Sequence, residues 1–192
     1  MLNRLMSNWV YGGALAGILL LCLAPLLVGT WSLPLILTFL HLPVYMLHQL
    51  EEHDDDRFRT FFNSKLGHGK EILQTGMVFI VNVPGVWGVI AVSLYLAANV
   101  HLGYALIAVY LVLVNAFVHI AAAIKLKCYN PGALTGAIVF VPFGAYSLHV
   151  INEAGGGAAE FQVIGFLSAL VIHAAIIAYV KIRCKTLGVT FG

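Results

Sequence analysis

The sequence predicts an all-α protein, a polytopic membrane helix bundle of about six transmembrane helices, and three observations support this fold class. Hydrophobic residues make up 61% of the 192 residues and charged residues only 9%, against ~25% charged in soluble domains. Apolar stretches recur at the length of ~20 residues that crosses a bilayer. With six crossings, all ten lysines and arginines fall on one side of the membrane. The chain, 1–192, is expected to form a single transmembrane helical domain.

The expected crossings follow one another with clear breaks between them. In order, the apolar stretches are 9–29, 33–53, 74–97, 101–124, 132–152 and 161–182. Turn-forming residues separate several of them, among them Gly29–Pro34, Tyr129–Gly132 and Gly155–Gly157. An even number of crossings puts both termini on the basic side, which the positive-inside rule makes cytoplasmic. The predicted location is integral to a membrane, in particular the bacterial cytoplasmic membrane.

One connection, 54–72, is much longer than the others. Asp54–Asp56 is followed by Arg57-Phe58-Arg59-Thr60-Phe61-Phe62, which mixes basic and aromatic side chains. This mixture favours a helix that lies at the level of the lipid headgroups. The alternative is a solvated loop with anchoring aromatic residues.

Net charge and cysteine spacing limit the partners of this chain. The formal net charge is only +2, so no nucleic-acid partner is expected. Cys22, Cys128 and Cys184 are scattered and form no zinc-ribbon or disulfide pattern. The expected partner is a membrane lipid or an apolar small molecule.

The second crossing ends in the sequence His48-Gln49-Leu50-Glu51-Glu52-His53. On a helix His48, Glu51 and Glu52 project from one face, at i, i+3 and i+4. Ionisable groups inside a membrane segment cost roughly 2.5–3.5 kcal/mol each, so such a group points to a function. One imidazole and two carboxylates suit a divalent cation, Zn²⁺ or Fe²⁺. His53 and Asp54–Asp56 are expected to be the solvated end of this helix.

A second pair of polar residues is expected at the same depth. His48 to Glu52 lie ~22–28 Å along their crossing, and Asn115 and His119 lie ~21–27 Å along theirs, from a rise of ~1.5 Å per residue. Asparagines can orient ligating imidazoles. The predicted metal ligands are His48, Glu51, Glu52 and His119, with Glu51 or Glu52 as the catalytic base. Candidates of lower rank in the same half of the bundle are Asn82, Asn115 and His173.

The fifth crossing contains an echo of the motif, His149-Val150-Ile151-Asn152-Glu153. Crossings two and five would correspond in a three-plus-three inverted repeat of the kind found in transporters. Because the two crossings run in opposite directions, the motifs are offset axially by ~15 Å. His149 and Glu153 are therefore secondary candidates.

The motif, in its apolar context, resembles that of the HXXEE-domain family of membrane proteins. The resemblance covers about 35–155, and three stretches carry it: His48-x-x-Glu51-Glu52, Asn115-x-x-x-His119 and Tyr129-Asn130-Pro131-Gly132. The family is named for its motif, so the resemblance concerns the site and does not indicate a substrate.

A weaker resemblance is to the glutamate-type intramembrane CAAX proteases, which place paired glutamates and histidines on membrane helices. Their pattern is EExxxR, then FxxxH, then HxxxN or HxxxD. Here Asp56 stands where the arginine should be, Asn115 stands at the phenylalanine position, and His149 is followed by Glu153.

Two functions remain open from the sequence. The first is a membrane-embedded metal-dependent enzyme, a hydrolase or an oxidoreductase, that acts on a lipid or another apolar substrate. The second is an ion-coupled transporter, which at this size would need to be a homodimer. A scaffold would be left if neither holds.

Overall fold

The computed structural model describes residues 1–189 as a helical bundle. Six helical segments are long and apolar enough to cross a membrane, which confirms the predicted fold class. They span Leu2–Leu27, Leu33–Lys65, Thr75–Asn99, Leu102–Leu126, Ala133–Gly156 and Ala159–Leu187. No strand occurs within the described residues.

Each crossing contains one or two α-helices. Their bounds are α1 (Leu2–Leu27), α2 (Leu33–His53), α4 (Thr75–Ile80) with α5 (Gly88–Asn99), α6 (Leu106–Leu126), α7 (Ala133–Thr135) with α8 (Val141–Ile151), and α9 (Ala159–Leu187). The second segment, Leu33–Lys65, contains α2 and also the short helix α3 (Arg57–Lys65), which belongs to the long connection 54–72. Helix α1 begins before the predicted 9–29 but ends at Leu27, and α9 extends beyond the predicted 161–182 at both ends. The extensions arise because polar turns next to an apolar stretch stay helical although hydropathy does not detect them.

Two crossings contain a π-helical stretch near a proline. Val81–Trp87 joins α4 to α5 and contains Pro84, and Gly136–Phe140 lies just before Pro142. Proline has no backbone N–H and clashes with the preceding turn, so a helix widens locally where it continues past one. The short helix α7 and the longer helix α8 are therefore parts of one continuous crossing.

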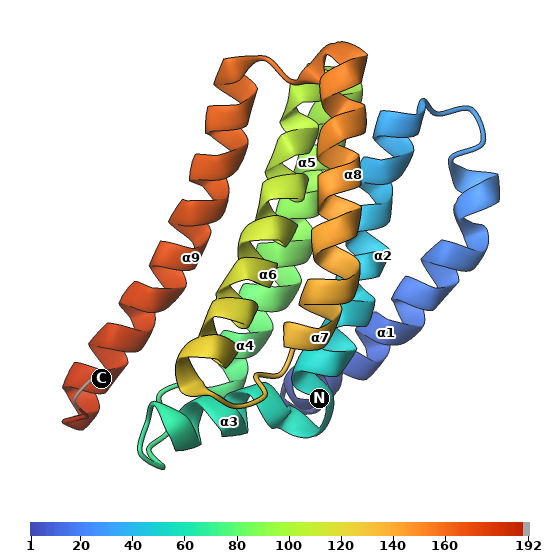
Figure 1. The fold of residues 1–192 in the computed structure, drawn as a ribbon. Helices are drawn as coiled ribbons and strands as arrows, with labels where there is room; N and C mark the ends of the chain where they lie inside the picture. Colours follow the sequence, from blue (N-terminus) through green and yellow to red (C-terminus); the bar gives the residue numbers. More distant parts are fainter. Residues whose placement is uncertain (190–192) are drawn as a thin grey trace.

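Helices α2 and α6 lie at the centre of the arrangement (Figure 1). Helix α1 packs on α2, while α2 also contacts α5, α6 and α8. Helix α9 lies at the edge of the bundle and packs mainly on α6. The start of α1 and the end of α9 are at one end of the bundle, and α3 lies at that same end (Figure 1).

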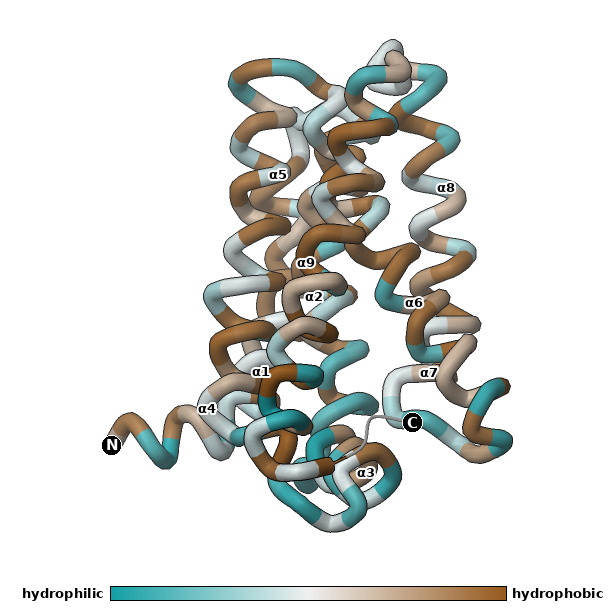
Figure 2. Tube along the Cα trace, turned by 90° about the vertical axis from the view of Figure 1, so that its left-hand side faces the viewer, coloured by the Kyte–Doolittle hydropathy of each residue, from teal (hydrophilic) through white to brown (hydrophobic). Residues whose placement is uncertain are grey.

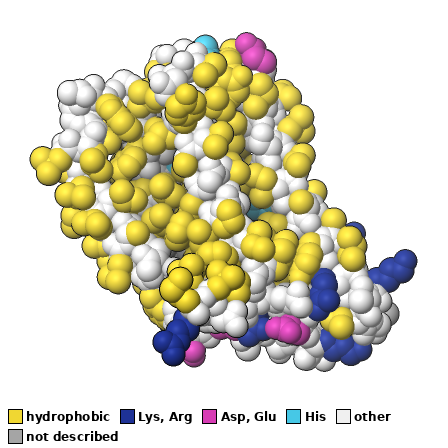
Figure 3. Space-filling view, turned by 180° about the vertical axis from the view of Figure 1, so that it is seen from behind, with side chains coloured by type: hydrophobic (Ala, Val, Ile, Leu, Met, Phe, Trp, Pro, Cys, Tyr) yellow, Lys and Arg dark blue, Asp and Glu magenta, His cyan; other side chains and the backbone are white. Residues whose placement is uncertain are grey.

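Hydrophilic residues gather at the end of the bundle that carries α3 (Figure 2). Lysine and arginine side chains cluster at this end in the space-filling view, and hydrophobic side chains cover the surface above them (Figure 3). We call this the basic end. Its assignment to the cytoplasm remains a prediction.

A sharp turn connects α2 to α3. Asp55 and Asp56 both have positive φ, at 51° and 56°, in the left-handed region that aspartate tolerates better than most residues. Asp54 is paired with Arg57, and Asp56 is paired with Arg59, which also reaches Glu71 at 2.9 Å. The acidic run is therefore a paired turn. It folds α3 back so that the Phe58 ring approaches the end of α2.

Candidate metal centre

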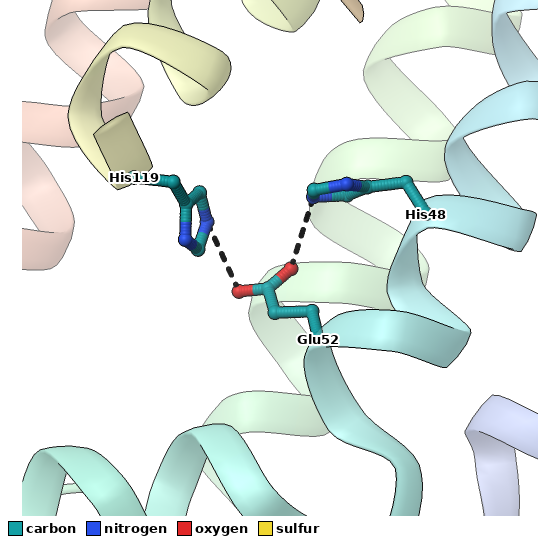
Figure 4. Close-up of side chains that lie close together, drawn as sticks. All are labelled: His48, Glu52 and His119. Atoms are coloured by element: carbon teal, nitrogen blue, oxygen red, sulfur yellow. Dashed lines mark ion pairs between the residues drawn. The ribbon is translucent and has the colours of Figure 1, made fainter. Parts of the chain in front are cut away.

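Three of the predicted ligands meet between α2 and α6 (Figure 4). His48 and Glu52 lie one turn apart on α2, and His119 comes from α6. The Nε2 atom of His48 is 3.5 Å from Oε2 of Glu52, and the Nε2 atom of His119 is 3.4 Å from Oε1. All three side chains are buried. One ligand atom from each lies within 4.8 Å of the other two, so the group could hold a metal ion.

These spacings fit a shared ion better than direct hydrogen bonds. Two ligand atoms each ~2.1 Å from an ion at the tetrahedral angle are ~3.4 Å apart. The His48 Nε2 atom is buried without a hydrogen-bond partner among the described residues, and an unpaired buried nitrogen is costly. Two imidazoles and one carboxylate form a ligand set that leaves an open position on Zn²⁺ or Fe²⁺.

The loop between α6 and α7 orients the His119 ring. The Nδ1 atom of His119 is 3.1 Å from Oδ1 of Asn130. An amide oxygen only accepts, so this contact places the ring proton on Nδ1 and leaves a lone pair on Nε2. Metal-binding histidines are typically held by a contact of this type.

The His48 ring is oriented through a hydroxyl group. Its Nδ1 atom is 2.6 Å from Oγ1 of Thr135, and that hydroxyl donates its hydrogen to Oε2 of Glu51. Because the hydroxyl has one hydrogen, it must accept from His48 Nδ1–H. The chain from Glu51 through Thr135 therefore fixes the His48 proton on Nδ1 and leaves the Nε2 lone pair facing Glu52.

Glu51 lies outside the three-residue group, although the sequence predicted it as a ligand or base. Consecutive helix positions differ by ~100°, so Glu51 points away from Glu52. Its carboxylate accepts from the Tyr129 and Thr135 hydroxyls and from three backbone N–H groups, those of Gly132, Leu134 and Thr135. Partial desolvation and this contact raise the pKa of Tyr129 to about 12, so the phenol remains a donor. Glu51 thus anchors the turn that contains Asn130 and Thr135, the residues that orient the two imidazoles. We call residues 129–135 the 129–135 turn.

Glycine is required where the 129–135 turn passes the two imidazoles. Gly132 has φ of 91°, in the left-handed region. A Cβ atom there would lie 2.9 Å from Cε1 of His119 and 3.1 Å from Cε1 of His48. The backbone can approach both rings this closely only without a side chain.

His53 is buried at the same site, so its expected role as part of a solvated helix end is wrong. Its Nε2 atom is 3.4 Å from Oε2 of Glu52, and neither ring nitrogen has a hydrogen-bond partner among the described residues. The rings of Trp9 and Phe58 cover it, at 5.1 and 5.5 Å between centroids. The prediction failed because α1 and α3 shield a position that hydropathy places at the surface.

A cavity of about 230 Å³ adjoins the group. Glu52, His53 and His119 are among the polar residues that line it. Apolar side chains line most of the rest, from α3, α4, α6 and α9. A second cavity of about 290 Å³ lies at the basic end, with Ser7, Asp55 and Arg59 in its wall. His53 and Val78 line both cavities.

The lower-ranked candidates have other positions. Asn82 accepts a hydrogen bond from Gln49, at 2.9 Å, and donates to the Val78 carbonyl, so it does not orient an imidazole. Asn115 and His173 line the cavity outside the three-residue group. His149 and Glu153 are exposed near the opposite end of the bundle and do not join the site.

Sequence reasoning missed Asn130 and Thr135, the two residues that orient the imidazoles. The Tyr129–Gly132 stretch was recognised as a turn, but a turn pattern does not show which crossing the turn folds against. The spacing of Thr135, one helical turn after Pro131, carries no signal of its own.

The geometry defines a class of protein, a membrane helix bundle with a buried two-histidine, one-glutamate group beside an apolar cavity. The chain belongs to the family described as "protein of unknown function with HXXEE motif", which matches residues 39–147. The matched region contains His48, Glu52, His119 and the 129–135 turn. No curated protein and no solved structure matches the chain, and nothing supports the protease resemblance.

Proposed function

We propose that this protein is a membrane-embedded, metal-dependent enzyme that acts on a lipid or another apolar substrate, in the bacterial cytoplasmic membrane. One observation carries the proposal. A buried group fit for a metal ion opens onto an apolar cavity that transmembrane helices enclose. A purely structural polar cluster would not need an adjoining cavity.

The residues of this chain would share the work as follows. His48, Glu52 and His119 would hold the ion, while Asn130 and Thr135 keep both imidazoles in the ligating tautomer. A bound divalent ion would polarise a substrate oxygen and lower the pKa of a bound water. Glu52, His53, His119 and His173 are titratable groups in the cavity wall, whereas Glu51 faces the 129–135 turn. The apolar wall would exclude bulk water from the reacting group.

Metal analysis of the purified protein tests this proposal. Wild-type protein should retain close to one Zn or Fe per chain. Glu52→Gln keeps the shape of the side chain but removes a charged ligand, and should lower metal affinity by at least ~10-fold, since even groups that orient ligands contribute ~10–100-fold. Glu153→Gln at the opposite end is the matched control and should bind as wild type. A protein free of Zn, Fe and Mn in every preparation would overturn the proposal.

The transporter hypothesis was motivated by the pairing of the His149 and Glu153 motif with the His48 and Glu52 motif. His149 and Glu153 are exposed and distant from the three-residue group, so this pairing does not form. Counterflow in liposomes still separates the two functions. Uptake of a substrate that persists after the metal is removed would favour the transporter over the enzyme.

A further inference from the structure

The cavity next to the metal group is built between α6 and α9. These helices touch closely at Gly165, where an added Cβ would lie 2.8 Å from the Leu106 carbonyl oxygen. They then diverge toward the basic end (Figure 1). There, polar contacts tie α9 to the long connection: Lys70 donates to the Leu187 carbonyl at 2.6 Å, and Arg183 donates to the Glu71 carbonyl at 3.2 Å. The cavity fills the space between these two attachments.

The cavity reaches the surface that would face lipid. Val118 on α6 and Ile177 on α9 both line it, and they are 46% and 47% exposed. Its lining on α9 runs from Ile172 to Val180, which is ~12 Å along the helix axis. An apolar molecule in the bilayer can therefore enter sideways between α6 and α9.

The volume of the cavity suits part of a lipid and excludes a whole one. Its ≈ 230 Å³ exceeds the ~150 Å³ of an engineered cavity that holds benzene. It is smaller than the ~300–1,000 Å³ of sites that enclose a complete drug-sized ligand. The cavity can take the polar end of a lipid with the first part of one chain, while the remainder stays in the bilayer.

The charges in the cavity wall favour a lipid whose polar end is neutral. Within the described chain, no lysine or arginine lines the cavity, and Glu52 is its one carboxylate. Without a bound ion, an anionic headgroup would face Glu52 with no cation to pair with, and unpaired buried charges are costly. A divalent ion held by His48, Glu52 and His119 would have its charge partly offset by the Glu52 carboxylate, and a neutral polar end would add no further buried charge.

Besides His53, a second polar side chain in the cavity wall has an atom without a partner among the described residues. The Oδ1 atom of Asn115 is buried and makes no hydrogen bond to a described residue. Asn115 lies one helical turn from His119, on the same face of α6, and lines the cavity. A ligand hydroxyl or amide N–H would satisfy this amide.

We infer that the cavity binds a single-chain lipid with an uncharged polar end, such as an alcohol, ester or amide, which enters laterally between α6 and α9. This inference rests on the proposed function for its catalytic meaning and deepens it by naming the substrate class. The polar end would lie at Asn115 and the metal group, and the chain would follow the apolar wall of α9.

Photolabelling in phosphatidylcholine nanodiscs tests the inference. The probes are hexadecanol and hexadecyl phosphate, each carrying the same diazirine on the chain. Hexadecanol should label cavity residues of α6 and α9 at least about 10-fold more than the phosphate, both as purified and after chelation. Equal labelling by the two probes, or labelling confined to residues outside the cavity, would overturn the inference.

Variants of α9 show whether the label enters the cavity. Ile176→Trp fills it and should reduce hexadecanol labelling to background. Val171→Trp, on the exposed face of the same helix, is the matched control and should label as wild type. Ala122→Phe fills the cavity from α6 if the first variant fails to fold. Equal labelling of the filled and control variants would count against the cavity.

The metal variant separates failure of this inference from failure of the proposed function. Glu52→Gln should lose metal while hexadecanol still labels the cavity residues, because Asn115 and the apolar wall are unchanged. If the wild-type protein is labelled selectively but never contains metal, the lipid site is supported and the proposal of a metal-dependent enzyme is overturned. Stoichiometric metal together with unselective labelling would overturn the lipid site alone.

Discussion

Thr135→Val removes the hydroxyl that connects Glu51 to His48 and changes little else. Valine has nearly the same shape, and Glu51 keeps four other donors from the 129–135 turn. Among the described residues, the hydroxyl is the one hydrogen-bond partner of His48 Nδ1. Without it, the ring can move its proton to Nε2 and turn that nitrogen from a metal ligand into a donor.

The expected effect of Thr135→Val is a loss of metal affinity of about 10–100-fold, which corresponds to about 1.4–2.7 kcal/mol. Competition titration against a metal indicator in detergent measures it. Thr38→Val is the matched control, because the Thr38 hydroxyl is also buried and donates to a helix carbonyl at 2.7 Å, but it lies away from the site. Thr135→Ser should restore affinity because it restores the hydroxyl. Equal affinities for Thr135→Val and Thr38→Val would refute the orienting chain.

Two further predictions concern the glycine and the metal. Gly132→Ala should displace both imidazoles and lower metal affinity, besides costing about 1–2 kcal/mol for its left-handed backbone. Gly69→Ala carries a similar φ of 82° with nothing within 4 Å of the added atom, so it should lose stability but bind metal normally; equal metal loss in both variants would contradict the steric argument. Because ligating imidazoles must be neutral, metal should dissociate as the pH falls from about 7 to 5, through the usual imidazole pKa of about 6.5. Thermal unfolding should show the bound metal stabilising the fold by about 2.7 kcal/mol at 100 times its Kd, and a melting temperature indifferent to metal across this pH range would refute a bound ion.

The fold was predictable because hydropathy and the distribution of lysine and arginine act over whole crossings. The meeting of α2 and α6 was also predictable, since helical rise alone matched the depth of His48 and Glu52 to that of His119. These arguments need only the position of a residue along its own helix.

The remaining features of the site depend on contacts between distant segments. The sequence shows two adjacent glutamates but not their different roles. Only the fold of the 129–135 turn shows that Glu51 anchors this turn and that Glu52 belongs to the buried group. His53 looks solvated until Trp9 and Phe58 are placed over it. Asn82 has a suitable depth, yet Gln49 occupies its side chain.

The contact between Glu51 and the 129–135 turn also has a consequence for the newly synthesised protein. Glu51 and the N–H of Gly132 are 81 residues apart in the chain. During membrane insertion, the second crossing is therefore complete well before the groups that satisfy its carboxylates have been made. If the two glutamates were at the bilayer midplane, they would stay without polar partners during this time, and the free-energy cost would be high. At the basic end of the bundle they can remain hydrated until the fifth crossing has been synthesised. The location of the motif at this end therefore allows the second crossing to insert before the residues that pair with Glu51 exist.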